Sequence, residues 1–340
     1  MRINNLLNIG LDTLEIKLIS NVILSQTVYS FKNPKGIEIG RLKSIANGYK
    51  LSICLPKIIR KDNIIPFNTN DYKYLSAILG HIEKYLYDLF GNHFPEMIVS
   101  NCEVNCTIAL SDKSKTAPLL SLLAHILLTT EEKLFITCSG EKRGKRYSAV
   151  KNLCSGKRIE SIKTPILSNS RFCFKIYDKG LEGNISDKGL IRIEFCYTKR
   201  GLKYAKTGKS LCDFLSPDSI NSLLLCYKKD YKTYFIDRYW NNRDIKSLDD
   251  EYSVPIYKEI ITIIYNDLVS HQGQPLTVAL MNKNYVEMDF DLFRKACNMY
   301  YKNKDSSRKA CYRIRNSGEL QINTGIIKEF VSFSKQIIYG

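Results

Sequence analysis

Residues 171–179 read Arg-Phe-Cys-Phe-Lys-Ile-Tyr-Asp-Lys, and the even positions 172, 174 and 176 are apolar. The odd positions carry most of its charge, and they include Lys175, Tyr177 and Lys179. Successive side chains of a β-strand point to opposite faces of the sheet. The stretch therefore predicts a strand with one buried face and one face open to solvent.

Two further stretches alternate in the same way. Residues 191–197 place Arg192 and Glu194 opposite isoleucine and phenylalanine, and residues 102–108 place Glu103 with two neutral polar side chains opposite cysteine, valine and isoleucine. If the three strands share one sheet, its open face gathers a tyrosine, two lysines, an arginine and two carboxylates. The link from residue 179 to residue 191 includes Gly183, Asn184 and Gly189, which is typical of an antiparallel hairpin.

This set of side chains suits metal-assisted attack on a phosphodiester by tyrosine. A tyrosine hydroxyl has a pKa near 10 and is a weak nucleophile, so such chemistry needs a cation held by oxygen ligands and basic residues nearby. Each member also has an ordinary interpretation. Tyr177 is one of 22 tyrosines, the carboxylates could be solvated, and Arg192 with Glu194 could form a surface ion pair of little energetic value.

The composition favours a polyanionic partner. The chain has 340 residues, enough for one large domain or two ordinary ones, and 44% of them are hydrophobic. Its formal net charge is +17 and its pI is about 9.3. Such an excess favours nucleic acid, through phosphate contacts and counterion release, over a membrane surface, because no basic amphipathic helix stands out.

Cysteine content and hydropathy predict a cytoplasmic protein. The eleven cysteines are an odd number, and neither a leader-like apolar segment nor a run of membrane-spanning length is present. Cys102 and Cys106 have buried parity and are interpreted as core residues. There is no GxxxxGK[ST] motif, which argues against an ATPase, and no His-hydrophobic-His pair, so any metal site lacks an obvious histidine.

Charge and periodicity organise the rest of the chain. Residues 11–18 and 49–55 alternate as strands, while residues 72–90 and Thr116–Thr129 have helical spacing, as have two later segments at 255–269 and 290–302. We predict a first domain over residues 1–228 and a mainly helical region over residues 229–340, with a DNA-binding or accessory role.

The segment 139–163 is polar and basic. Either it is a solvated loop or it is an arm that contacts DNA, and the sequence leaves both open. The cations assigned to the second interpretation are Lys142, Arg143, Lys145 and Arg146.

The order of these motifs resembles the replication initiators of filamentous phages, of the gene II protein type. In that family a Tyr-x-Lys-x-x-Glu segment, here Tyr177 to Glu182, precedes a strand with Arg-hydrophobic-Glu, here Arg192 to Glu194. Further similar segments include the strand that carries Glu103, the Leu-Pro-Lys run at residues 55–57 and the opening strand at residues 11–18. The resemblance extends over roughly residues 10–216.

The resemblance implies a role for each matched residue. Tyr177 would be the nicking nucleophile, Lys179 would stabilise the scissile phosphate, and Arg192 would contact phosphate or orient Glu194. Candidate ligands for Mg²⁺ or Mn²⁺ are Glu103, Glu194 and Glu182. The candidate DNA contacts on the matched segments are Lys175, Lys199, Arg200 and Lys203. Asp12 shares the parity of Leu14 and Ile16, which favours a structural role or the other face of the sheet.

We therefore predict an α+β fold, with an antiparallel sheet that has helices on one face and the active site on the other. The predicted function is rolling-circle replication initiation in a bacterial host cell: single-strand nicking at an origin, a covalent phosphotyrosine intermediate and later rejoining. The partners would be single- and double-stranded DNA, with a host helicase and polymerase. A plasmid initiator or conjugative relaxase with the same chemistry, and a non-enzymatic DNA-binding regulator, are the alternatives.

Overall fold

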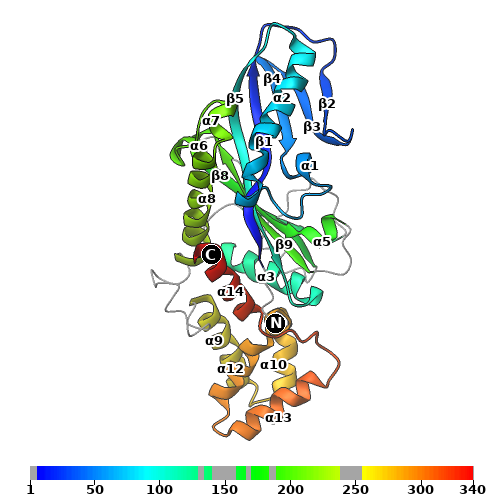
Figure 1. Ribbon diagram of the computed structural model, residues 1–340. Coiled ribbons are helices and arrows are strands. Elements are labelled where there is room, and N and C mark those ends of the chain that lie inside the picture. The colour runs from blue at the N-terminus through cyan, green and yellow to red at the C-terminus, as the bar shows by residue number, and fades with distance from the viewer. Residues whose placement is uncertain are drawn as a thin grey trace. The chain divides into compact units, whose positions relative to one another are not determined.

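The computed structural model describes residues 6–128, 134–139, 158–165, 170–183, 189–237 and 255–339 (Figure 1). The chain divides into two compact units. The first comprises Met1–Ile108, Lys163–Lys179 and Arg192–Asp230, and the second comprises Ala109–Ile162, Gly180–Ile191 and Tyr231–Gly340. Each unit is described by itself.

One mainly antiparallel sheet of nine strands is the central element, in the order β2-β3-β4-β1-β5-β9-β8-β7-β6. The strands are β1 Leu6–Ile19, β2 Val28–Lys32, β3 Glu38–Ile45, β4 Gly48–Cys54, β5 Glu96–Ala109, β6 Phe135–Cys138, β7 Ile159–Lys163, β8 Phe172–Asp178 and β9 Leu190–Thr198. The three strands predicted to carry the polar cluster, β5, β9 and β8, are therefore neighbours.

Two helices cover the apolar face of the sheet in the first unit. In α2 (Leu75–Phe90), the ring of Phe90 lies 5.3 Å from that of Tyr49 on β4, centroid to centroid. In α8 (Pro217–Lys232), the Tyr227 hydroxyl donates to the carbonyl of Ile193 on β9 at 3.1 Å. The helices pack on this face because the apolar residues of each strand point to it, and burial of apolar surface is the main contribution to the stability of the unit.

Short elements complete the first unit. They are α1 Pro56–Ile59, the 3₁₀ helix η1 Thr69–Tyr74, α6 Lys199–Tyr204 and α7 Leu211–Phe214. The predicted helix at 72–90 begins at Leu75, because η1 precedes it with its own capping box from Asn68 and Asp71. It ends at Gly91, whose φ of 56° suits glycine.

Helices dominate the described part of the second unit. Their bounds are η2 Lys113–Lys115, α3 Thr116–Leu128, α5 Lys179–Glu182, which begins on the last residue of the first unit, η3 Thr233–Asp237, α9 Pro255–Ser270, α10 Pro275–Met281, α11 Lys283–Met288, α12 Phe290–Tyr300, α13 Lys304–Arg315 and α14 Ile326–Tyr339. Asp289 caps α12 by accepting from the amide of Asp291, and it also accepts from Ile327 at the start of α14.

These elements confirm the predicted α+β class, with strands and helices segregated and a helical C-terminal region. Cys102 and Cys106 are fully buried on the apolar face, as their parity predicted. Within the described ranges, the helices are all too short or too polar to span a bilayer. The domain division near residue 228 stays a prediction.

Candidate active site

Tyr177 and Glu194 face each other across β8 and β9. The Tyr177 hydroxyl donates to Oε1 of Glu194 at 2.6 Å. Both side chains are buried, with Tyr177 and Glu194 each 5% exposed. Burial is the main cause that raises the pKa of the Glu194 carboxyl, and Lys175, Tyr177 and Arg192 oppose it. The Glu194 carboxyl, whose pKa is raised, is therefore a proton acceptor within hydrogen-bond distance of the Tyr177 hydroxyl.

Two lysines flank the tyrosine ring. Lys175 Nζ lies 3.8 Å from the ring centroid of Tyr177 and 3.6 Å from Oε2 of Glu194. Lys179 Nζ lies 5.8 Å from the same centroid, and Lys179 is itself only 6% exposed. Because about a third of the Lys175 side chain is exposed, this cation has access to solvent beside the phenol.

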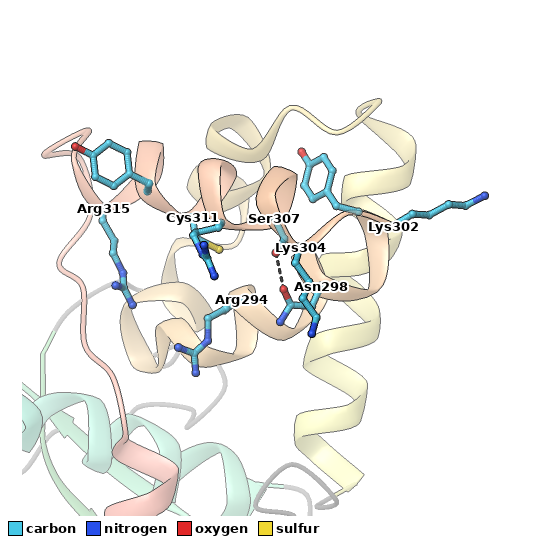
Figure 2. A pocket seen from close by; sticks show the side chains of 10 residues that line it. Arg294, Asn298, Lys302, Lys304, Ser307, Cys311 and Arg315 are labelled. Atoms are coloured by element: carbon cyan, nitrogen blue, oxygen red, sulfur yellow. Dashed lines mark hydrogen bonds between the residues drawn. The ribbon is translucent and has the colours of Figure 1, made fainter.

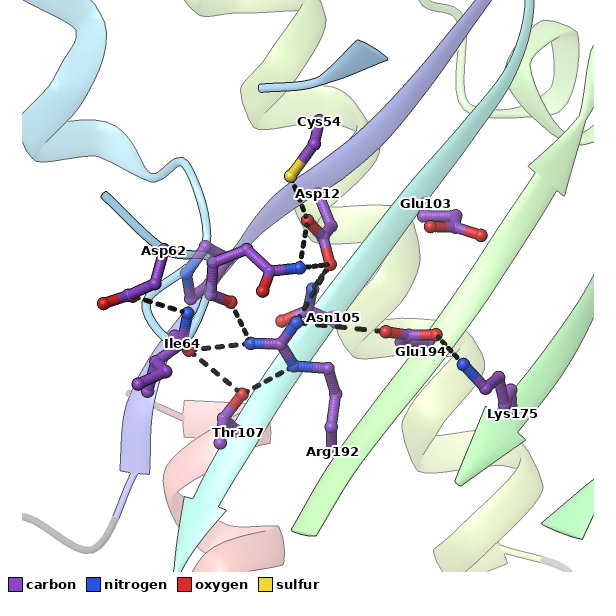
Figure 3. A network of polar contacts seen from close by, with 12 residues as sticks. Asp12, Cys54, Asp62, Ile64, Glu103, Asn105, Thr107, Lys175, Arg192 and Glu194 are labelled. Atoms are coloured by element: carbon purple, nitrogen blue, oxygen red, sulfur yellow. Dashed lines mark hydrogen bonds and ion pairs between the residues drawn. The ribbon is translucent and has the colours of Figure 1, made fainter. Parts of the chain in front are cut away.

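Arg192 lies at the centre of the polar cluster and is fully buried (Figure 3). Its Nη1 donates to Oδ2 of Asp12 at 2.9 Å and lies 4.0 Å from Oε1 of Glu194. Its Nε donates to the Thr107 hydroxyl at 2.9 Å, and its Nη2 donates to the carbonyls of Asn63 and Ile64. The guanidinium thereby joins β1, β5 and β9, and its donors are engaged within the protein.

Asp12 is the acceptor at the other end of this network. Besides Arg192, it accepts from Asn105 Nδ2 at 3.3 Å, from Asn63 Nδ2 and from the thiol of Cys54 at 3.3 Å. The parity argument assigned Asp12 to the apolar face or to a structural role. The first assignment is wrong: Asp12 lies on the polar face, because the pairing of β1 with β5 shifts between Leu11 and Leu14, so that two β1 residues oppose Glu103 alone. The structural role agrees with its buried ion pair to Arg192.

A covering segment, residues 60–67, closes the polar face over Arg192. Phe67 exchanges two backbone hydrogen bonds with Leu11, both 2.8 Å, and Arg60 binds both carboxylate oxygens of Asp71 at 2.5 Å. The approach is so close that a Cβ at position 10 would overlap the Phe67 carbonyl, which explains Gly10. The prediction of an open, solvated face is therefore wrong at its centre.

The Glu103 carboxyl is also destabilised in its charged form. Burial and the nearby Glu194 carboxylate raise its pKa to about 7, and a hydrogen bond from Thr13 offsets only part of this. On the same strand, Oδ1 of Asn105 is buried and accepts no hydrogen bond from the described residues. In this cluster, the Glu103 carboxyl and the Asn105 side-chain oxygen are the two acceptors whose burial is least offset by hydrogen bonds or cations.

The predicted metal ligands do not form a finished metal centre. Glu182 is exposed on α5, whereas Glu194 is already bound to Tyr177 and Lys175. Across the described ranges, His, Cys, Asp and Glu side chains do not gather in any group of three that could hold a metal ion. The side chains as arranged do not fit Mg²⁺ or Mn²⁺, and the metal stays a prediction.

The predicted DNA contacts fall into three groups. Lys199, Arg200 and Lys203 are exposed on α6, whereas Lys175 belongs to the Tyr177 cluster. The remaining residues lie outside the described part of the chain, and they are Lys142, Arg143, Lys145 and Arg146.

Comparison with known proteins gives little. No family model matches the chain. No curated protein matches it. Among solved structures, a rolling circle replication initiator protein from Geobacillus stearothermophilus is similar over 67% of this chain and 85% of that one, with 9% identity and a TM-score of 0.33.

Proposed function

We propose that the first unit nicks and rejoins single DNA strands in rolling-circle replication, with Tyr177 as the nucleophile. The observation that carries the proposal is the 2.6 Å hydrogen bond from the Tyr177 hydroxyl to Glu194. A buried carboxylate of raised pKa is a better proton acceptor near neutral pH than a solvated one. The ordered motifs at residues 177–194 and the formal charge of +17 support a DNA substrate.

The chemistry balances with these residues. The phenol oxygen attacks phosphorus, its proton passes to Oε1 of Glu194, and the phosphorus–oxygen bond to the leaving deoxyribose breaks. The leaving deoxyribose oxygen takes a proton from solvent. The product is a tyrosyl–DNA phosphodiester, and the freed sugar hydroxyl can reverse the step, so rejoining needs no ATP. Lys175, at 3.8 Å from the Tyr177 ring, is the cation best placed to offset charge that develops on the phosphate.

The proposal assigns Arg192 to positioning. Its donors are occupied by Asp12, Thr107 and the covering segment, which favours a role in orienting Glu194 over direct phosphate contact. Since Tyr177 is only 5% exposed, a phosphate reaches its hydroxyl only after neighbouring side chains move aside.

The burial of Tyr177 also favours the alternative of a DNA-binding regulator, in which this tyrosine only stabilises the sheet. The test uses Tyr177→Phe and the parent, incubated with supercoiled DNA that carries the sequence flanking the gene. We expect nicked circles and a covalent protein–DNA adduct with the parent, and a loss of at least about 10³-fold with the variant.

Tyr197→Phe is the matched control. Tyr197 is also buried, on β9, and its hydroxyl donates to the Asp230 carboxylate at 3.0 Å. Each substitution removes one hydrogen bond to a carboxylate and costs about 1–3 kcal/mol of stability, but only Tyr177→Phe should lose the adduct. Equal nicking by Tyr177→Phe and Tyr197→Phe would sink the assignment of the nucleophile.

A further inference from the structure

A cationic pocket in the second unit lies between α12, α13 and the turn that joins them (Figure 2). Its volume is about 600 Å³. Five of the side chains that line it are cationic, and they are Arg294, Lys302, Lys304, Arg308 and Arg315. No carboxylate lines it, so the pocket has a strong positive charge.

The cations of the pocket are only lightly neutralised. Arg294 pairs with Asp291 at 3.1 Å and Arg308 with Asp305 at 3.7 Å, each one helical turn away. Arg315 lies over the ring of Phe290, 5.0 Å from its centroid. In the described part of the chain, Lys302 and Lys304 take part in no ion pair. A surface of this kind stabilises a bound polyanion more than it stabilises its own fold.

The remaining lining adds hydrogen-bond donors and aromatic surface. Ser307 donates to Oδ1 of Asn298 at 2.6 Å, which leaves the amide nitrogen of Asn298 with hydrogen to donate. Tyr312 lines the same pocket and is 68% exposed. Donors, guanidinium groups and an exposed phenol are the groups that proteins direct at nucleic-acid phosphates and sugars.

We propose that this pocket binds the phosphate backbone of duplex DNA and holds the duplex while Tyr177 acts on one strand. Three of the pocket cations, Lys304, Arg308 and Arg315, lie four and seven residues apart on α13, and this spacing puts them along one face of the helix. A row of charge matches the closely spaced phosphates of a duplex better than a single free nucleotide. This inference rests on the proposed function for the identity of the polyanion.

The test removes two charges from the pocket by Lys304→Gln with Arg308→Gln. Duplex binding is measured by fluorescence anisotropy from 50 to 300 mM salt, with a single strand and ATP as separate ligands. We expect duplex affinity at 100 mM salt to fall about tenfold or more, and the slope of log K against log salt to flatten by about 1.8.

The matched control is Lys309→Gln with Arg313→Gln. These two residues lie on α13 with the same spacing of four and are exposed, but they do not line the pocket. The control should change the slope by less than about 0.5. Thermal melting by circular dichroism verifies that both double variants fold.

Three results would overturn the inference. They are equal duplex affinity and slope in the two double variants, a loss confined to ATP, and a loss confined to the single strand. The readout is equilibrium binding, so it is independent of nicking. If the parent fails to nick but the pocket variant loses duplex affinity, the proposed function fails, while the assignment of the pocket as a duplex-binding site stands.

Discussion

Two cation-rich regions, one in each unit, handle charge in opposite ways. In the first, Arg192 is fully buried and its guanidinium is neutralised by Asp12 and held by hydroxyl and carbonyl acceptors. In the second, Arg308 keeps 82% of its side chain exposed, beside a similarly exposed aspartate at 3.7 Å. A buried charge requires partners within the fold, whereas an exposed one remains available to an external partner.

The difference indicates that the buried region holds side chains in a fixed geometry, whereas the exposed region is suited to binding a polyanion by electrostatic attraction. The Arg192 guanidinium has directional bonds to β1, to β5 and to the covering segment, so it can hold Glu194 in place against Tyr177. The pocket on α12 and α13 has charge without such constraints. Substitutions that remove one charged side chain from either region test whether the two regions differ in this way.

The largest effect is expected for Arg192→Met. The substitution leaves the Asp12 carboxylate buried without its cation, and removal of one partner from a buried ion pair costs about 3–5 kcal/mol. Urea unfolding followed by circular dichroism measures the loss. Arg192→Lys should recover only part of it, because one ammonium cannot replace the fork that also reaches Thr107 and Ile64. A cost below about 1 kcal/mol would contradict the structural role.

A second, smaller effect is expected from pH. Folded Glu103 keeps its proton up to a pKa of about 7, whereas the ordinary value is 4.5. Between these values the folded state binds more protons than the unfolded state, so stability falls as pH rises from about 4.5 to 7. At pH 8 the free energy of unfolding of Glu103→Gln should therefore exceed that of the parent by about 3 kcal/mol, and near pH 5 the two should be similar.

The control for this pH effect is Glu38→Gln. The pKa of Glu38 is lowered, mainly by the Arg41 hydrogen bond, and the residue lies on the surface. Its substitution should leave the fall in stability between pH 5 and pH 8 intact. If Glu103→Gln keeps the same fall as the parent, Glu103 is not the group that titrates.

Glu103→Gln also tests the binding of the predicted divalent cation, without any nicking assay. If Glu103 and Asn105 supply oxygen ligands, Mg²⁺ at pH 8 should raise the melting temperature of the parent and have a smaller effect on Glu103→Gln. Equal shifts in the two proteins, or none, would remove Glu103 from the ligand set.

Strand parity predicted the fold because each strand of the polar cluster has one apolar face to bury. It brought Glu103, Tyr177 and Glu194 to one side of the sheet, which the structure confirms. It could not predict the shift in pairing after Leu11 that brings Asp12 to this side, because a bulge depends on how two distant strands pair.

The covering segment was missed for a different reason. Residues 60–67 are largely irregular and have no periodicity, so nothing in their pattern indicates what they contact. Their backbone carbonyls are what make Arg192 a buried residue. A sequence shows which side chains can be charged, but whether they face solvent depends on tertiary contacts of this kind.

The smallest effect is expected for Arg308→Met, the counterpart of Arg192→Met in the second unit. Arg308 and its partner Asp305 are 82% and 72% exposed, so water solvates both charges when they separate, and their attraction is screened by salt. The free energy of unfolding, measured in urea, should change by less than about 0.5 kcal/mol, even though both substitutions replace an arginine by methionine. A cost near that of Arg192→Met would mean that the pocket on α12 and α13 is part of the folded core, and the contrast between the two regions would disappear. With stability unchanged, any loss of duplex affinity in this variant reports the charge at the surface alone.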